Sequence, residues 1–181
     1  MKIVILHGSP RKNRNSDTLA KYFIKGMNEN KNNQIKHFYL NDLNISPCQG
    51  CLTCATSLNH SCVINDDMQE IYRSYTDADI IVFVTPMYWG YMTAQLKTVM
   101  DRMEALAWEH FYHKHFVIII TYRHHYESTV AFFKRIAPFF DIKLDFIICQ
   151  TYDPVSQKDI PIENIKEKLE DAYKLGKKLF V

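Results

Sequence analysis

Long runs of like charge and long apolar runs are both missing from this sequence. Its 22 basic and 20 acidic side chains leave a formal charge of +2, so we expect no nucleic-acid or membrane-binding arm. The opening apolar stretch, residues 3–6, runs at once into a polar segment, and it is too short for a signal peptide or a membrane span. We therefore expect a cytoplasmic protein whose partner is a small molecule or another protein, with no nucleic acid and no membrane.

Internal repeats and low-complexity segments are also missing. The 181 residues are 47% hydrophobic and 13% aromatic, which is enough for one ample core but not for two. The sequence therefore predicts a single domain over residues 1–181.

Short apolar runs alternate with amphipathic stretches along the chain. Strands are expected at residues 2–6, 34–39, 79–84, 116–121 and 143–149, with Thr85 and Pro86 ending the third. Helical spacing predicts five buried stripes: Leu19, Ala20, Phe23 and Met27; Met68, Ile71, Tyr72 and Tyr75; Leu96, Val99, Met100 and Met103; Phe133, Ile136, Ala137 and Phe140; Ile165, Leu169, Ala172 and Leu179. We expect Asn15, Ser16 or Asp17 to cap the first helix, and the cap of the second helix to lie near Asp66. The alternation predicts an α/β fold with a five-stranded parallel sheet in the order 2-1-3-4-5 and helices on both faces.

In such a sheet, ligands bind at the carboxyl ends of the strands, where the winding direction reverses. The loops at that point are residues 7–16, 85–91 and 121–126. The first loop leads from a strand into a helix, so its amides and hydroxyls would meet at a helix N-terminus that favours an anion. Arg11 adds a forked donor that suits phosphate oxygens. The loop lacks the glycine patterns of ATPases and of dinucleotide-binding proteins, and the alternative interpretation is a polar surface turn.

The second loop contains the segment Pro86-Met87-Tyr88-Trp89-Gly90-Tyr91. Its large flat side chains and its glycine can offer an aromatic wall and free amides to a planar ring. The alternative is ordinary packing at a strand end. Because this loop lies opposite the phosphate loop in the expected fold, we favour the ring-binding interpretation.

Several motifs together resemble the NADPH-dependent FMN reductase family, whose fold is flavodoxin-like. They are Gly8-Ser9-Pro10-Arg11 with Asn15-Ser16, then Pro86-Met87-Tyr88-Trp89-Gly90, and Lys97 with Asp101-Arg102. The resemblance covers nearly the whole chain and implies a flavodoxin-like three-layer sandwich. It implies that the FMN phosphate is held by Ser9, Arg11, Asn15 and Ser16, and that Pro86, Met87, Tyr88, Trp89 and Gly90 run along the isoalloxazine ring. Lys97, Asp101 and Arg102 are interpreted as a helix face with ion pairs, which the resemblance places at a contact between subunits.

The third loop lacks the glycines that are usual in this family. It reads Thr121-Tyr122-Arg123-His124-His125-Tyr126. Tyr122 is expected to stack on the flavin and Arg123 to meet a phosphate or an anionic flavin, with a solvated turn as the alternative. The neighbouring histidines point apart in a loop, so they stay unassigned and no metal pair is expected there.

Four of the five cysteines, Cys48, Cys51, Cys54 and Cys62, lie in a cysteine-rich loop at about residues 47–65. Reduced cytosolic cysteines that cluster point to a metal or to redox work before structural disulfides. Their Cys-x2-Cys-x2-Cys-x7-Cys spacing suits a 4Fe-4S cluster and resembles that of the iron-sulfur flavoprotein branch of the same family. Zinc, a thiol redox pair at Cys51 and Cys54, and plain reduced thiols are the alternatives. Cys149 lies in an apolar strand and is expected to be buried packing.

The resemblance implies an FMN-dependent oxidoreductase, in which NAD(P)H reduces the flavin and electrons pass to a quinone, another small molecule or a protein. One alternative is an iron-sulfur electron carrier for a ferredoxin-like partner. Another is a cofactor-free binding protein of the same fold. The family's habit and the abundant aromatic residues lead us to expect a homodimer or homotetramer. No protein acid or base is assigned, because the cofactor carries the chemistry.

Overall fold

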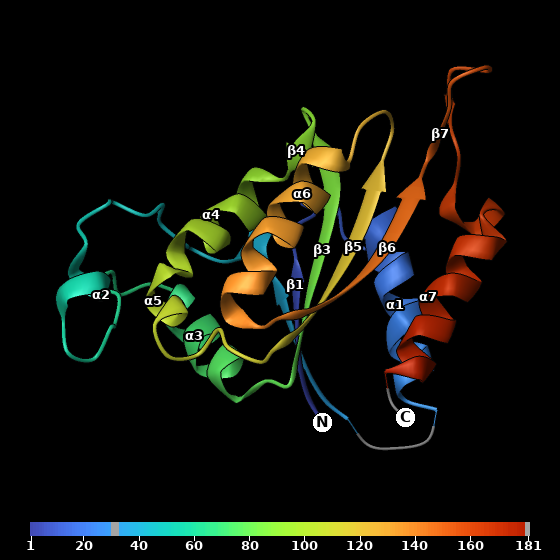
Figure 1. The fold of residues 1–181 in the computed structure, drawn as a ribbon. Helices are drawn as coiled ribbons and strands as arrows, with labels where there is room; N and C mark the ends of the chain where they lie inside the picture. Colours follow the sequence, from blue (N-terminus) through green and yellow to red (C-terminus); the bar gives the residue numbers. More distant parts are fainter. Residues whose placement is uncertain (30–32, 180–181) are drawn as a thin grey trace.

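The computed structural model describes residues 1–29 and 33–179, and a parallel sheet lies at its centre (Figure 1). The long strands are β1 (Lys2–His7), β2 (Gln34–Tyr39), β3 (Ile80–Tyr88), β5 (His115–Tyr122) and β6 (Lys143–Gln150). They lie in the order β2-β1-β3-β5-β6, and each neighbouring pair is parallel. The predicted order of the five strands is therefore confirmed.

Helices cover both faces of the sheet (Figure 1). One face carries α1 (Asn15–Met27) and α7 (Lys166–Lys178), and the other carries α3 (Met68–Asp77), α4 (Ala94–Arg102), α5 (Glu104–Ala107) and α6 (Glu127–Ile136). The shorter elements are α2 (Thr53–Thr56) and 3-10 turns at Leu40–Asp42, Ala137–Phe140 and Ile162–Asn164. The predicted three-layer arrangement is confirmed.

The central strands divide their side chains between the two helical layers, because successive residues of a strand point to opposite faces. In β3, Ile81 and Phe83 pack toward α3 and α4, whereas Val82 and Val84 pack toward α1 and α7. These contacts form two hydrophobic clusters, one on each face of the sheet. Every residue of the five predicted helical stripes is buried or packs against one of them. The periodicity of the sequence therefore identified the inner faces of the main helices correctly.

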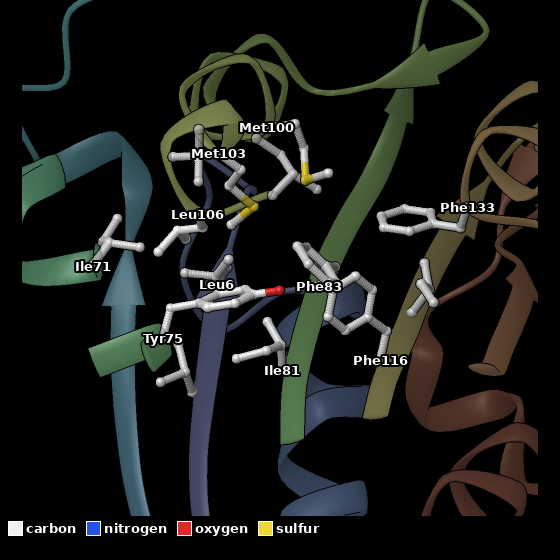
Figure 2. Close-up of a cluster of buried hydrophobic side chains, with 14 of the residues drawn as sticks. Leu6, Ile71, Tyr75, Ile81, Phe83, Met100, Met103, Leu106, Phe116 and Phe133 are labelled. Carbon is white, nitrogen blue, oxygen red and sulfur yellow. The ribbon is translucent and has the colours of Figure 1, made fainter. Parts of the chain in front are cut away.

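Figure 2 shows the cluster between the sheet and the α3–α4 layer. Tyr75 of α3 directs its hydroxyl inward toward Phe83, whose ring meets Phe116 edge-on at a centroid distance of 4.9 Å. Met100 and Met103, at the end of α4, close the cluster from above in this view. Dense packing of this kind makes the strands a rigid base for the loops that follow them.

The third strand continues beyond its predicted end. β3 passes through Thr85 and Pro86 and runs on to Tyr88. Its pairing with β1 stops at Val84, while its pairing with β5 extends to Pro86 opposite Thr121. Proline is tolerated here because a strand that has lost one neighbour does not need every amide donor.

Two short hairpins interrupt the predicted strict alternation. β3 turns back into β4 (Tyr91–Met92), and β7 (Tyr152–Asp153) pairs with β8 (Lys158–Asp159) in the segment between β6 and α7. Both hairpins lie beyond the carboxyl ends of the long strands (Figure 1). Strands of two residues carry too little alternation to be recognised from a sequence pattern.

Candidate functional site

A cavity of about 830 Å³ lies at the carboxyl ends of the long strands. This volume is within the usual range for small-molecule and cofactor pockets. Every residue that was expected to bind the cofactor lines it, with the exception of Gly90: Ser9, Arg11, Asn15, Ser16, Pro86, Met87, Tyr88, Trp89 and Tyr122. The structure therefore brings the three predicted loops together around one hollow.

Other residues of the cavity wall were not singled out from the sequence, although Asn13, Arg14 and Thr121 lie in the predicted loops. They are Asn13, Arg14, Thr121, Thr151, Asp159, Ile160, Pro161 and Glu163, and Arg123 of the third loop also lines the wall. Five of these eight residues, from Thr151 to Glu163, lie between β6 and α7 (Lys166–Lys178). A signal was present, since Thr151 comes directly after a strand and ligands gather where parallel strands end.

The first loop forms a tight turn that delivers backbone amides to the start of α1. The Ser9 hydroxyl accepts from the Arg11 amide and donates to the Arg11 carbonyl, each at 3.1 Å. The Thr18 amide makes the first helical hydrogen bond, to the Arg14 carbonyl at 2.9 Å. The three amides before Thr18 precede that ladder, so they form the positive end of the helix beside the cavity.

The predicted cap of α1 was wrong. The N-cap position is held by Arg14, and no side chain caps the helix there. The carboxylate of Asp17 turns back instead and accepts from the Asn13 amide at 2.8 Å. At the start of α3 the N-cap position is held by Asp67, which makes no side-chain cap, while the preceding Asp66 accepts from the Met68 amide at 3.1 Å.

The second loop is a two-residue hairpin turn between β3 and β4. Trp89 and Gly90 have φ angles of 51° and 77°, and two successive positive φ values fit the type I′ turn of tight hairpins. The Trp89 side chain is fully exposed and Tyr88 is 39% exposed. Gly90 thus sets the turn that presents Trp89 at the cavity, although Gly90 does not line it.

The third side of the cavity carries an aromatic pair and an ion pair. Tyr122 ends β5, and its ring lies 4.7 Å from that of Tyr126. Burial raises the pKa of Tyr122, so its hydroxyl stays protonated and able to donate. Arg123 does not stand free, because its guanidinium pairs with Asp159 of β8. This contact ties the third loop to the β7–β8 hairpin.

The charges of the wall are unevenly placed. Arg11 and Arg14 lie on the side of α1, whereas the acidic groups, Asp159 and Glu163, follow β6. Since Arg123 is paired with Asp159, the excess of positive charge lies beside the start of α1. That end of the cavity favours an anionic group.

The cysteine-rich loop lies away from this cavity, and none of its residues lines the wall. Figure 1 shows α2, within this loop, beside the α3–α4–α5 layer and far from β6. Cys48 and Cys51 are exposed, whereas Cys54 and Cys62 are half-buried. In residues 1–29 and 33–179, no group of three or more His, Cys, Asp or Glu side chains is placed to hold a metal ion. In the described residues the four thiols are therefore not gathered into a metal site, and the structure does not support the expected 4Fe-4S cluster.

The thiols differ in their surroundings. Hydrogen bonds from Thr53 lower the pKa of Cys51, while burial and then Glu104 raise the pKa of Cys54. Cys149 is buried, as predicted, and burial raises its pKa to about 11.

The expected helix face of Lys97, Asp101 and Arg102 needs a correction. Lys97 and Asp101 form an exposed ion pair, but the Arg102 side chain is fully buried and pairs with Asp66 at 2.8 Å. Arg102 lies three residues after buried Val99, so it turns into the protein instead of facing solvent. It also donates to the carbonyls of Ser46 and Ile64, at 2.8 and 3.3 Å. Arg102 therefore joins the two ends of the cysteine-rich loop.

A second hollow, of about 530 Å³, lies near the start of β1 and β2. Its charged lining residues are paired with one another: Lys2 with Asp77, and Lys36 and Arg73 with Glu70. The cavity at the carboxyl ends is the better candidate, because it is larger and has convergent amides and cationic groups.

Comparison with known proteins identifies a family model and curated relatives that are similar to this chain. The family model described as NADPH-dependent FMN reductase matches residues 1–143. An iron-sulfur flavoprotein of Archaeoglobus fulgidus is 42% identical over 106 residues, which are 58% of this chain and 52% of that protein. The chain spans about half the length of the curated relatives it matches.

Solved structures share the fold. An azoreductase from Bacillus anthracis str. Sterne superposes with a TM-score of 0.77 at 15% identity, covering 98% of this chain and 99% of that one. An FMN-dependent NADH-azoreductase from Bacillus anthracis str. Ames Ancestor, solved in complex with FMN, gives 0.70 at 14% identity, covering 99% of both chains. The predicted flavodoxin-like fold is confirmed. Within the described residues, no helix combines the length and the apolar character needed to cross a membrane.

Proposed function

Because the chain belongs to the NADPH-dependent FMN reductase family, we propose that it is an FMN-dependent oxidoreductase that uses NAD(P)H to reduce a quinone, another small molecule or a protein. The observation that carries the proposal is the cavity of about 830 Å³, in which a cationic helix start and an aromatic hairpin face one hollow. Bound FMN supplies hydride acceptance from NAD(P)H and electron release to the acceptor. In this proposal the protein is a cytoplasmic homodimer or homotetramer.

The first loop would hold the FMN phosphate. Ser9 and Ser16 offer hydroxyls, Asn15 begins α1, and Arg11 offers its forked guanidinium at the same side of the cavity. A phosphate at this point would receive hydrogen bonds from charged and backbone donors and would also gain from the helix dipole. These residues bind and orient the cofactor and are not assigned a proton transfer.

The second and third loops would hold the isoalloxazine ring. Residues 86–89 lie along one wall of the cavity and Tyr122 ends the neighbouring strand. Flat aromatic surfaces and the adjoining backbone amides suit a planar ring with polar edges. These side chains would also exclude water from the reacting face of the ring.

Arg11→Ala is expected to weaken FMN binding by about 10-fold to 100-fold, as the loss of a charged hydrogen bond should. Flavin fluorescence quenching measures the dissociation constant. Lys25→Ala is the matched control, since it removes an exposed positive charge from the last turn of the same helix, outside the cavity. Unchanged FMN affinity in Arg11→Ala would remove Arg11 from the phosphate site.

Rapid anaerobic mixing with NADPH or NADH tests the activity. The protein loaded with FMN is expected to lose its oxidised-flavin absorbance much faster than free FMN at the same concentration. Protein that takes up FMN but shows no such loss would be an electron carrier and not a reductase. Protein that takes up no FMN at all would support the cofactor-free binding protein.

A second candidate function is electron carriage through an iron-sulfur cluster. The name of the Archaeoglobus relative, iron-sulfur flavoprotein, and the spacing of the four cysteines favour it. The finding that, in the part of the chain that the structure describes, the thiols form no group able to hold a metal ion weighs against it. Iron and acid-labile sulfide analysis of protein purified without oxygen separates the two: four of each per chain would establish the cluster, and none would leave the flavin as the redox centre.

A further inference from the structure

A buried network of polar side chains lies beneath the first loop, outside the cavity wall. His7 ends β1 and Asp17 belongs to the first turn of α1, and both side chains are almost completely buried. The Nδ1 atom of His7 lies 2.9 Å from Oδ1 of Asp17. An ionised carboxylate can only accept, so His7 carries its proton on Nδ1 and donates it to Asp17.

The second oxygen of Asp17 acts on the loop itself. Oδ2 accepts from the Asn13 amide at 2.8 Å, and Asn13 has a φ of 58°. Asparagine adopts this left-handed conformation more readily than most residues, but at a higher steric cost than glycine, and the bond to Asp17 helps to fix it. Asn13 lines the cavity between Arg11 and the start of α1, whereas Asp17 does not line it.

His7 is itself fixed to the sheet. Its Nε2 lies 3.0 Å from Nδ1 of His37 on β2, and its ring stacks on that of Tyr39 at 4.3 Å. Burial and the nearby His7 lower the pKa of His37. The carboxylate of Asp17 is therefore connected through His7 to two side chains of the neighbouring strand.

We infer that Asp17, anchored by His7, is a positioning residue that holds the first loop in the shape that receives the phosphate of the flavin. The inference rests on the proposed function, because it assumes that the anion at this turn is the FMN phosphate. Asp17 acts through Asn13 and the start of α1, so its effect is confined to the part of the ligand that meets this turn. Riboflavin, which has the same ring and no phosphate, should be almost indifferent to it.

The test compares FMN and riboflavin as ligands of the same variants. In Asp17→Ala, FMN affinity is expected to fall by about 10-fold to 100-fold, from loss of a charge-assisted bond and release of Asn13. Riboflavin affinity is expected to change by less than about threefold, which is within the effect of ordinary surface changes. Asp17→Asn should keep most of the FMN affinity, because its amide oxygen still accepts from Asn13.

A second variant addresses the left-handed residue directly. Asn13→Gly placed in the Asp17→Ala background is expected to recover part of the FMN affinity, because glycine adopts positive φ without steric cost. An equal loss of FMN and riboflavin affinity in Asp17→Ala would overturn the inference, since it would indicate a general structural role. Unchanged FMN affinity would overturn it as well.

The histidine provides an independent pair of variants if Asp17→Ala does not fold. In His7→Asn the amide nitrogen can occupy the place of Nδ1 and still donate to Asp17, whereas in His7→Gln it occupies the place of Nε2 and cannot. We expect the selectivity for FMN over riboflavin to be kept in His7→Asn and lost in His7→Gln. Equal selectivity in the two variants would contradict the anchoring role. Wild-type protein that binds neither flavin would reject the proposed function itself, and the two failures are thus distinguishable.

Discussion

Arg102→Met is expected to lower the free energy of unfolding by about 3–5 kcal/mol, the usual cost of leaving one charge of a buried pair without its partner. Asp66 would be the uncompensated charge, since its carboxylate receives Arg102 at 2.8 and 3.2 Å. Burial opposes both charges. The bonds that Asp66 accepts from Arg102 and from the Ser46 and Met68 amides together outweigh it and lower the pKa of Asp66. The bond to Asp66, with the nearby Tyr72 and Cys62, raises the pKa of Arg102. Urea denaturation followed by circular dichroism measures the change.

A matched control for Arg102→Met exists on the same helix. Lys97 forms an exposed ion pair with Asp101, and Lys97→Met is expected to cost less than about 1 kcal/mol because exposed pairs contribute little. Replacing both partners, as in Arg102→Met with Asp66→Leu, should recover part of the loss because no unpaired charge remains. If Arg102→Met and Lys97→Met lowered the free energy of unfolding equally, the buried pair of Arg102 and Asp66 would not have the stabilising role assigned to it.

The effect of Arg102→Met should depend on pH in a defined direction. Because the pKa of Asp66 is lower in the folded protein than its ordinary value of 3.8, this bond stabilises fully above that pH and is lost as the pH falls below it. The difference in unfolding free energy between wild type and Arg102→Met should thus be constant near neutrality and shrink in acid.

The exposure of the cysteine thiols should rise in the Arg102→Met variant, since Arg102 joins Ser46 to Ile64 at the base of the cysteine-rich loop.

The parts of the fold that could be predicted from the sequence are those determined by the spacing of apolar residues within a segment and by the order of segments along the chain. Leu96, Val99, Met100 and Met103 follow helical spacing, and all four are buried. Strand order followed from the alternation of elements and from the rules of parallel connections. The loops at the carboxyl ends were placed by the same rules, which is why the expected phosphate and ring residues meet in one cavity.

The parts that could not be predicted depend on contacts between distant residues. Asp17 looks like a helix cap in sequence, but His7 of β1 draws its carboxylate beneath the loop. Arg102 looks like its neighbour Lys97, and only the fold brings Asp66 to it. The spacing of the cysteines indicates metal or redox chemistry, but it does not determine the backbone path of the cysteine-rich loop. In that path Leu52 adopts a φ of 60° just before α2, which the sequence pattern does not indicate.

Gly176→Ala is expected to destabilise the protein by about 2–3 kcal/mol, because a methyl group in a packed interface forces the surrounding backbone apart. A Cβ on Gly176 would lie 2.1 Å from the Phe23 carbonyl oxygen, and a Cβ on Gly26 would lie 2.0 Å from the Tyr173 carbonyl oxygen. The backbones of α1 and α7 are therefore in direct contact at these two glycines. The obstacle is main chain, which cannot rotate away as a side chain can.

The sign of the stability change in Gly176→Ala shows whether backbone packing or helix propensity dominates at this position. In a helix with room for a side chain, replacing glycine by alanine stabilises by about 1 kcal/mol. Ala131→Gly on the exposed face of α6 is the control, and it should cost about that amount without any clash. If Gly176→Ala instead raised the urea midpoint, the two helices could not be in backbone contact. Because α1 carries the first loop at its start, a displaced α1 should also weaken FMN binding, and the loss should be larger for FMN than for riboflavin.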